Sequence, residues 1–413
     1  MGRVVLATLG SLGDLHPMMA LGRGLRERGH TVVIATHEEY RSKIEALGLE
    51  FHAIRPASPG LDDPEQMAKV MEARKGTETV LKHVFSIARE TYADLTQAAQ
   101  GADFILAGEV VYVAGTVAEK LGIRWGFCAL APASIVSAYD MPVFSGVEVL
   151  ATLRPFGATV NQALVELIKL MTRDWSAPLN QLRQELGLQP IDDLIIRGKF
   201  SPHLVLALFS PLLAQPQPDW PTHSVVTGSA FYDGSKSIAP ELQQFLEAGE
   251  PPIVFTLGSA AVADPGNFFT ESIAAVQQLS RRAVLLIGKN SPPQHLPETI
   301  AAFDYAPFSQ LFPVARAIVH QGGVGTTAQA LRSGHPTLIM PYSHDQPDNA
   351  ARVERLGTSR TISRDHYTAP RVVKELRKLL SPQYAARAAE VGCIVQAEDG
   401  IRVACDAIDH QLD

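Results

Sequence analysis

The stretch AIVHQGGVGTTAQ, residues 317–329, decides the fold of the second half of the chain. Its first four residues, Ala317–His320, predict a short buried strand, and the residues after the glycines follow a helical pattern up to Gly334. A strand, a glycine-rich turn and a helix in this order are typical of a doubly wound parallel α/β sheet. In such sheets a ligand binds beyond the carboxyl ends of the strands, which is where this turn lies.

The glycine-rich turn predicts an anion-binding site. Glycines let the backbone approach a ligand closely, and the start of the following helix presents free N–H groups and the positive end of its dipole. Thr326 and Thr327 add hydroxyl donors, and His320 adds a donor that can carry charge. Phosphate is the usual occupant of such a site. A tight turn without a ligand is the competing interpretation.

The sequence around the turn narrows the kind of phosphate ligand. No lysine follows the glycines, so the Walker pattern is absent. Residues 323–328 match the dinucleotide pattern G-x-G-x-x-A, and Asp345 and Asp348 lie about 20 residues further on. That pattern normally opens the first strand–helix unit of a domain, whereas here two such units precede it. A dehydrogenase is therefore a weak alternative.

Short apolar strands alternate with helical segments twice along the chain. Strands are predicted at Arg3–Leu9, Thr31–Thr36, Leu49–Ile54, Asp103–Ala107, Arg124–Ala129, Leu204–Phe209, Pro252–Leu257, Ala283–Ile287, Ala317–His320 and Thr337–Met340. The proline-rich residues 214–222 are predicted as a linker. We therefore expect two doubly wound, Rossmann-like α/β domains facing each other across a cleft, 1–213 and 223–413, with the last helix able to pack back on the first.

Composition excludes several other classes of protein. The chain has 413 residues, 36 Lys and Arg against 43 Asp and Glu, and a net charge of −7, which argues against a nucleic-acid partner. Cys128, Cys393 and Cys405 show no paired spacing, so a disulfide framework or a cysteine zinc site is not expected, and a reducing, cytoplasmic location is. No signal peptide or membrane span is expected, while peripheral membrane contact stays open.

Several motifs resemble those of one enzyme family. They are FDYAP (303–307), LFP (311–313), HQGGVGTT (320–327) and HDQPDN (344–349), together with GSLGDLHP (10–17) and QPDWP (217–221). This set resembles the inverting UDP-glycosyltransferase superfamily, and within it the bacterial sterol-glucosyltransferase and rhamnosyltransferase type. The resemblance implies the GT-B fold, with an acceptor-binding N-terminal domain and a C-terminal domain for a nucleotide sugar. It also implies a UDP- or dTDP-sugar co-substrate, no other cofactor and no bound metal.

The same resemblance implies roles for individual donor-site residues. The diphosphate would be contacted by Gly258, Ser259, His320, Gly325, Thr326 and Thr327, and the sugar hydroxyls by Asp345 and Gln346. Tyr305 stands where many relatives have a tryptophan against the nucleobase. Gln329 stands where many relatives have a glutamate that holds the ribose, and an amide there brings no charge.

An inverting transfer needs a base that takes a proton from the acceptor hydroxyl. The resemblance places Asp14 at the position of that base, with His16 as the alternative. Plant relatives pair a histidine base with an aspartate, and the matching position here is Gly108. The loss of that partner favours an aspartate base, because a neighbouring carboxylate would raise its pKa and leave it partly protonated. Asp14 is also suited to capping the helix that follows.

The acceptor is the least determined part of the prediction. Met141, Phe144, Met171 and Trp175 either form the wall of a lipophilic acceptor pocket or belong to the core. We expect transfer of a hexose, and first of all glucose from UDP-glucose. The expected acceptor is a hydroxyl group of a sterol, a phenolic compound or a hydroxy-lipid, that is, of a lipid or natural product. A dTDP-deoxysugar transferase of the rhamnosyl type is the alternative. A sugar-nucleotide epimerase and a non-catalytic nucleotide-sugar binding protein are the other candidates.

Overall fold

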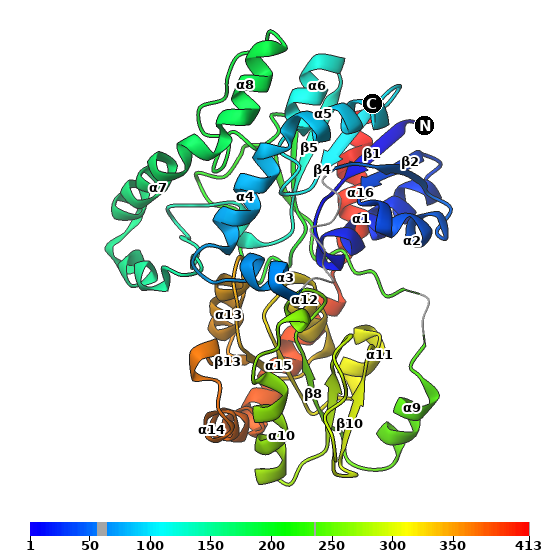
Figure 1. Ribbon diagram of the computed structural model, residues 1–413, viewed down its shortest axis with the longest axis vertical. Helices are drawn as coiled ribbons and strands as arrows, with labels where there is room; N and C mark the ends of the chain where they lie inside the picture. The colour runs from blue at the N-terminus through cyan, green and yellow to red at the C-terminus, as the bar shows by residue number, and fades with distance from the viewer. Residues whose placement is uncertain (56–63, 235–236, 413) are drawn as a thin grey trace. The chain divides into compact units, whose positions relative to one another are not determined.

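The computed structural model describes residues 1–55, 64–234 and 237–412 (Figure 1). The chain divides into two compact units. The first contains Met1–Pro59, Lys75–Tyr232 and Asp399–Asp413, and the second contains Gly60–Arg74 and Asp233–Glu398. Each unit is built on a parallel sheet with helices, which confirms the predicted α/β class.

The first unit contains a seven-stranded parallel sheet in the order β3-β2-β1-β4-β5-β6-β7. Its strands are β1 (Arg3–Ala7), β2 (Thr31–Thr36), β3 (Glu50–Ala53), β4 (Phe104–Ala107), β5 (Arg124–Ala129), β6 (Leu204–Ala207) and β7 (Ser224–Val226). The strand order reverses between β1 and β4, so the chain leaves these two neighbours toward opposite sides. This is the switch point at which doubly wound sheets bind ligands. Residues 10–14 follow β1 there, and Gly108 and Glu109 follow β4.

The second unit contains a six-stranded parallel sheet in the order β10-β9-β8-β11-β12-β13. Its strands are β8 (Ile253–Thr256), β9 (Ala283–Leu286), β10 (Ile300–Phe303), β11 (Ala317–His320), β12 (Thr337–Ile339) and β13 (Ser359–Thr361). The order reverses between β8 and β11. The turns after these two strands, which start at Gly258 and Gln321, therefore lie at the second switch point.

Helices cover the sheets in both units (Figure 1). The first unit has α1 (Leu12–Glu27), α2 (Arg41–Glu45), α4 (Gly76–Ser86), α5 (Ala88–Ala98), α6 (Ala114–Leu121), α7 (Ala158–Thr172), α8 (Ala177–Glu185) and α16 (Gly400–Leu412). The second has α3 (Pro64–Val70), α9 (Pro240–Glu247), α10 (Phe268–Gln278), α11 (Phe308–Leu311), α12 (Val324–Ser333), α13 (Gln346–Arg355), α14 (Ala369–Leu379) and α15 (Pro382–Gln396).

The unit boundaries differ from the predicted ones in two places. The expected linker, 214–222, lies within the first unit, because β7 comes after it and pairs with β6. A segment of the first half, Gly60–Arg74, belongs to the second unit. Its Met67 and Met71 are buried in the core of that unit, at 1% and 3% exposure, which explains the assignment.

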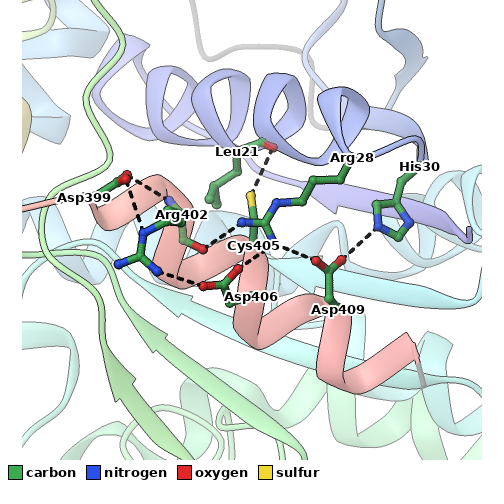
Figure 2. A network of polar contacts seen from close by, with 8 residues as sticks. All are labelled: Leu21, Arg28, His30, Asp399, Arg402, Cys405, Asp406 and Asp409. Carbon is green, nitrogen blue, oxygen red and sulfur yellow. Dashed lines mark hydrogen bonds and ion pairs between the residues drawn. The ribbon is translucent and has the colours of Figure 1, made fainter.

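The last helix returns to the first unit, where α16 packs against α1 (Figure 2). Arg28, just after α1, forms ion pairs with Asp406 at 2.7 Å and Asp409 at 2.6 Å. Asp409 also bonds to the ring of His30, with 2.8 Å between Nε2 and Oδ1. The buried Cys405 thiol points at the Leu21 carbonyl oxygen, 3.9 Å away. Polar contacts therefore tie the end of the chain to its first helix.

Candidate active site

His320 ends β11 at the second switch point, and its side chain is fully buried. Its Nδ1 accepts a hydrogen bond from the Gly322 amide at 3.0 Å, so in the neutral ring the hydrogen lies on Nε2. Nε2 is buried without a hydrogen-bond partner in the described part of the chain. Burial lowers the pKa of His320 to about 3. His320 is therefore a neutral hydrogen-bond donor in this structure, although a histidine can carry charge.

The first turn of α12 provides the other donors. Gly323 is its N-cap, and the N–H groups that follow have no partner within the helix. A side-chain carbon added to Gly325 would meet nothing within 4 Å, so the backbone there is open to a ligand. The Thr327 hydroxyl is buried and lacks a partner among the described residues, while Thr326 is 7% exposed. The predicted anion site has the donors it requires.

Gln321 is a site residue that the sequence prediction missed. Its amide nitrogen lies against Gly258, where an added Cβ would clash with it, and a Cβ on Gly323 would lie 2.7 Å from it. Its Oε1 is buried and has no partner in residues 1–55, 64–234 and 237–412. The Gln321 side chain thus joins the turn after β8 to the turn after β11. Its position between His320 and Gly322 was the only available signal.

Gly258→Ala should disturb this contact. Gly258 has a φ of 68°, and an alanine Cβ there would also collide with the Gln321 amide. We expect a loss of about 1–3 kcal/mol in the free energy of unfolding and weaker binding of nucleoside diphosphates. Gly325→Ala is the control for stability, because the added carbon enters open space. Equal thermal melting temperatures for Gly258→Ala and the unaltered protein would contradict this interpretation.

The loop after β12 carries the predicted sugar ligands. The Gln346 Oε1 accepts hydrogen bonds from the backbone amides of Tyr342, at 2.8 Å, and Ser343, at 3.4 Å. The Asn349 Nδ2 donates to the Gly322 carbonyl at 2.9 Å and to Asp345 Oδ2 at 2.7 Å. The loop is therefore fixed to the glycine-rich turn, and these two bonds of Gln346 use its oxygen and not its NH₂ group.

The other residues predicted to bind the nucleotide sugar are Tyr305, Ser259 and Gln329. The first two follow strands of the second sheet, and Gln329 lies further along α12. Tyr305 follows β10 and is 54% exposed, and Ser259 is exposed after β8. Gln329 Nε2 donates to Asp233 Oδ1 at 3.0 Å, and Arg332 pairs with the same carboxylate at 2.9 Å. The amide expected at the ribose is thus bonded to a neighbouring acid.

Asp14 lies in the first turn of α1, after the switch point of the first sheet. Its carboxylate accepts from the Ser11 amide at 2.8 Å, and the Ser11 hydroxyl accepts from Gly13, which completes a capping box. The carboxylate also lies against Gly10, whose φ is 125° and where a side-chain carbon would collide with it. The predicted capping role of Asp14 is confirmed by this geometry.

The Asp14 carboxyl has a strongly perturbed pKa. Burial, and after it the nearby charge of Glu109, together raise this pKa from 3.8 to about 7. Glu109 Oε1 is held by the Leu130 amide at 2.7 Å and by the Ser134 hydroxyl. Gly108, the position that matches the partner aspartate of plant relatives, carries no carboxylate, but the next residue, Glu109, places a negative charge near Asp14.

Glu109→Gln should shift the pH dependence of any step that needs ionised Asp14. The amide keeps an oxygen that can accept from Leu130 and Ser134, but removes the negative charge near Asp14. The pKa of Asp14 should fall, so the acid limb of the pH–rate profile should move to lower pH, by about one unit or less. An unmoved limb, or one displaced to higher pH, would show that Glu109 does not act on the titrating group.

His16, the alternative base, lies in the same turn, its ring centroid 5.0 Å from that of Tyr232. Burial and the charge of Lys43 lower the pKa of His16 to about 4. A base works best when its pKa is close to the operating pH, so Asp14 is the better candidate near neutrality.

The four predicted acceptor residues differ in burial. Met141 is 3% exposed and belongs to the core, and Phe144 and Trp175 pack against that core. Met171 is 69% exposed. A cavity of about 320 Å³ in this unit has other walls, which include Glu109, Tyr112, Phe127, Lys199 and Phe200.

Within residues 1–55, 64–234 and 237–412, no helix combines the length and apolar composition that crossing a membrane requires. In the same part of the chain, no three histidine, cysteine, aspartate or glutamate side chains are grouped as ligands for a metal ion.

Comparisons with known proteins match both units. Residues 4–131 match the glycosyltransferase family 28 N-terminal domain, and residues 271–398 match the erythromycin biosynthesis protein CIII-like C-terminal domain. The chain is 32% identical over 427 residues to the O-mycaminosyltylonolide 6-deoxyallosyltransferase of Streptomyces fradiae, covering 99% of this chain and 97% of that one. It is 30% identical over 438 residues to a sterol 3-beta-glucosyltransferase of Yarrowia lipolytica, covering 99% of this chain and 29% of that one.

The fold is shared with glycosyltransferases of known structure. The crystal structure of the glycotransferase of kitacinnamycin matches with a TM-score of 0.74 and 23% identity, covering 100% of this chain and 99% of that one. Two doubly wound units, with hydrogen-bond donors gathered around His320 and the start of α12 at the second switch point, are typical of the GT-B class. The chain belongs to the UDP-glycosyltransferase superfamily, among glycosyltransferases close to those that attach sugars to natural products.

Proposed function

We propose that the protein transfers a hexosyl group, with inversion, from a nucleoside diphosphate sugar to a hydroxyl of a small lipophilic acceptor. One observation supports this most strongly. Two buried polar atoms, His320 Nε2 and Thr327 Oγ1, have no partner among the described residues and lie where α12 begins. Buried polar atoms are normally hydrogen-bonded, so an anionic group at this turn would supply what they lack.

The proposed role of this cluster is to stabilise the leaving group. As the bond between the anomeric carbon and the phosphate oxygen breaks, negative charge collects on the diphosphate. The neutral N–H of His320 and the first amides of α12 would donate to that charge, and the helix dipole would add to their effect. These donors would do this without a bound metal ion, so we expect activity to survive treatment with a chelator.

Asp14 is proposed to take the proton from the attacking hydroxyl. Its pKa of about 7 leaves a large fraction ionised at neutral pH and still basic enough to accept a proton. The acceptor oxygen would attack the face of the sugar opposite the departing diphosphate, so the anomeric configuration inverts. The proposal requires that a single bound nucleotide sugar is contacted through its diphosphate by the turn before α12, while Asp14 contacts the hydroxyl that attacks its sugar.

Two donor classes are candidates. UDP-glucose is proposed first, because Asp345 and Gln346 offer a carboxylate and an amide to several sugar hydroxyls, and the Yarrowia relative is named a glucosyltransferase. A dTDP-deoxyhexose is the second candidate, favoured by the Streptomyces relative, whose name specifies a 6-deoxyallosyl group. Sterols, phenolics and hydroxy-lipids are the proposed acceptors, and a cytoplasmic setting is supported by three unpaired cysteines.

A mass-spectrometric panel would test this function. The protein is incubated with UDP-glucose or a dTDP-deoxyhexose and a mixture of sterol, phenolic and hydroxy-lipid acceptors. We expect an acceptor to gain one hexose or deoxyhexose, with the anomeric configuration opposite to that of the donor. Tight donor binding without transfer would instead identify a binding protein. A change in the sugar without any acceptor would identify an epimerase.

A further inference from the structure

The segment that precedes α4 contacts the loop that carries Asp345 in the candidate donor site, although the segment belongs to the first half of the sequence. α3 packs against the short helix Ala261–Ala263, which follows the turn of Gly258 and Ser259. Just after α3, the Met71 sulfur lies 3.8 Å from the Ser343 hydroxyl, two residues before Asp345. Residues 64–71 therefore contact the loop that carries Asp345 directly, and on the other side they contact the helix Ala261–Ala263 and not the turn of Gly258 itself.

His344 makes the polar contact between this segment and the sugar loop. Its ring donates a hydrogen bond to the backbone carbonyl of Val70, the last residue of α3. His344 also has a φ of 57°, in the left-handed region that a residue with a side chain rarely adopts. An unfavourable backbone conformation persists only where surrounding contacts hold it, and the bond to Val70 is such a contact.

Asp345 is the next residue along the chain, so the conformation of His344 sets the direction of its carboxylate. On the other side the loop is fixed by Asn349, which bonds to Asp345 and to Gly322, and by Gln346, which bonds to Tyr342. From the side of α3 it is contacted by Met71, through Ser343, and by Val70, through His344. The loop is thus held between the glycine-rich turn and α3.

We propose that residues 64–71 are a determinant of donor-sugar binding, and that His344 is the positioning residue that couples them to Asp345. The inference rests on the proposed function, because it takes Asp345 and Gln346 as ligands of the sugar. The segment acts on the sugar and not on the nucleotide. Its loss should therefore remove the additional affinity that the sugar contributes and leave the affinity for the nucleoside diphosphate itself unchanged.

Calorimetric titration with UDP, UDP-glucose, dTDP and a dTDP-deoxyhexose would test this proposal. His344→Ala and His344→Asn both lose the bond to Val70, while asparagine still tolerates the left-handed backbone. We expect both variants to bind the preferred nucleotide sugar about 10-fold more weakly and to bind the matching diphosphate within about 2-fold of the unaltered protein. Met71→Lys, which expels the segment from the core, should give the same pattern.

The controls separate the possible outcomes. His295→Asn changes an exposed histidine that also has a positive φ, 56°, and should alter neither affinity. Combining His344→Ala with Met71→Lys should be no worse than Met71→Lys alone, because displacing the segment already removes the bond between Val70 and His344. Unchanged sugar affinity in the His344 variants, or an equal loss for diphosphate and sugar, would overturn the inference. If the unaltered protein bound no nucleoside diphosphate, the proposed function itself would fail.

Discussion

Asp14→Asn should lower turnover by about 10²- to 10⁴-fold while the dissociation constant of the nucleotide sugar stays the same. The amide can still accept the hydrogen bond from Ser11 that fixes the start of α1, so the fold should survive. It cannot accept the proton of the attacking hydroxyl. Turnover and donor affinity are measured separately, by steady-state kinetics and by calorimetry, because only the first depends on the base.

The same residue should determine the pH dependence of the unaltered enzyme. Asp14 must be ionised to act, and its pKa is raised to about 7, so kcat/KM should rise with pH and level off above that value. His16→Ala is the matched comparison from the same turn and should reduce turnover far less. Near-normal turnover in Asp14→Asn, or a larger loss in His16→Ala, would contradict the assignment of the base.

His320→Ala should weaken donor binding and transfer together. The buried Nε2 donor would serve the diphosphate in the ground state and, more strongly, in the transition state, where its charge grows. We expect about 10-fold weaker binding of nucleoside diphosphates and about 10²-fold lower kcat. Both quantities are measured for the diphosphate and for the complete nucleotide sugar.

Conservative variants test whether His320 acts as a neutral donor. His320→Gln retains an uncharged N–H group and should recover part of the lost rate, since the pKa of His320, about 3, already keeps the ring neutral at working pH. His223→Ala removes an exposed histidine of the first unit and should change nothing. Unaltered donor affinity in His320→Ala would remove this residue from the site.

Much of the fold could be predicted because buried parallel strands have a clear sequence signal. β1, β2, β5 and β11 begin where continuous apolar runs predicted them. The candidate site followed from the same reasoning, since the turns after β1 and β11 both lie at switch points of their sheets. Glycines at these turns then marked where a backbone comes close to a ligand or side chain.

Other features depend on contacts between distant residues and could not be predicted. β10 and β13 were missed because they are short edge strands that are half-buried for most of their length. Residues 60–74 belong to the second unit because Met67 and Met71 pack in its core, and no local sequence pattern predicts that packing. The neutral state of His320 likewise follows from its burial. The sequence could not predict this state, because a histidine beside glycines can be either neutral or charged.

A crystal structure with a bound nucleoside diphosphate would test the central claim most directly. We expect the terminal phosphate within hydrogen-bond distance of His320 Nε2 and of the amides that begin α12, with the Asp14 carboxylate facing the vacant sugar position. A diphosphate bound elsewhere, with His320 Nε2 still lacking a partner, would contradict it.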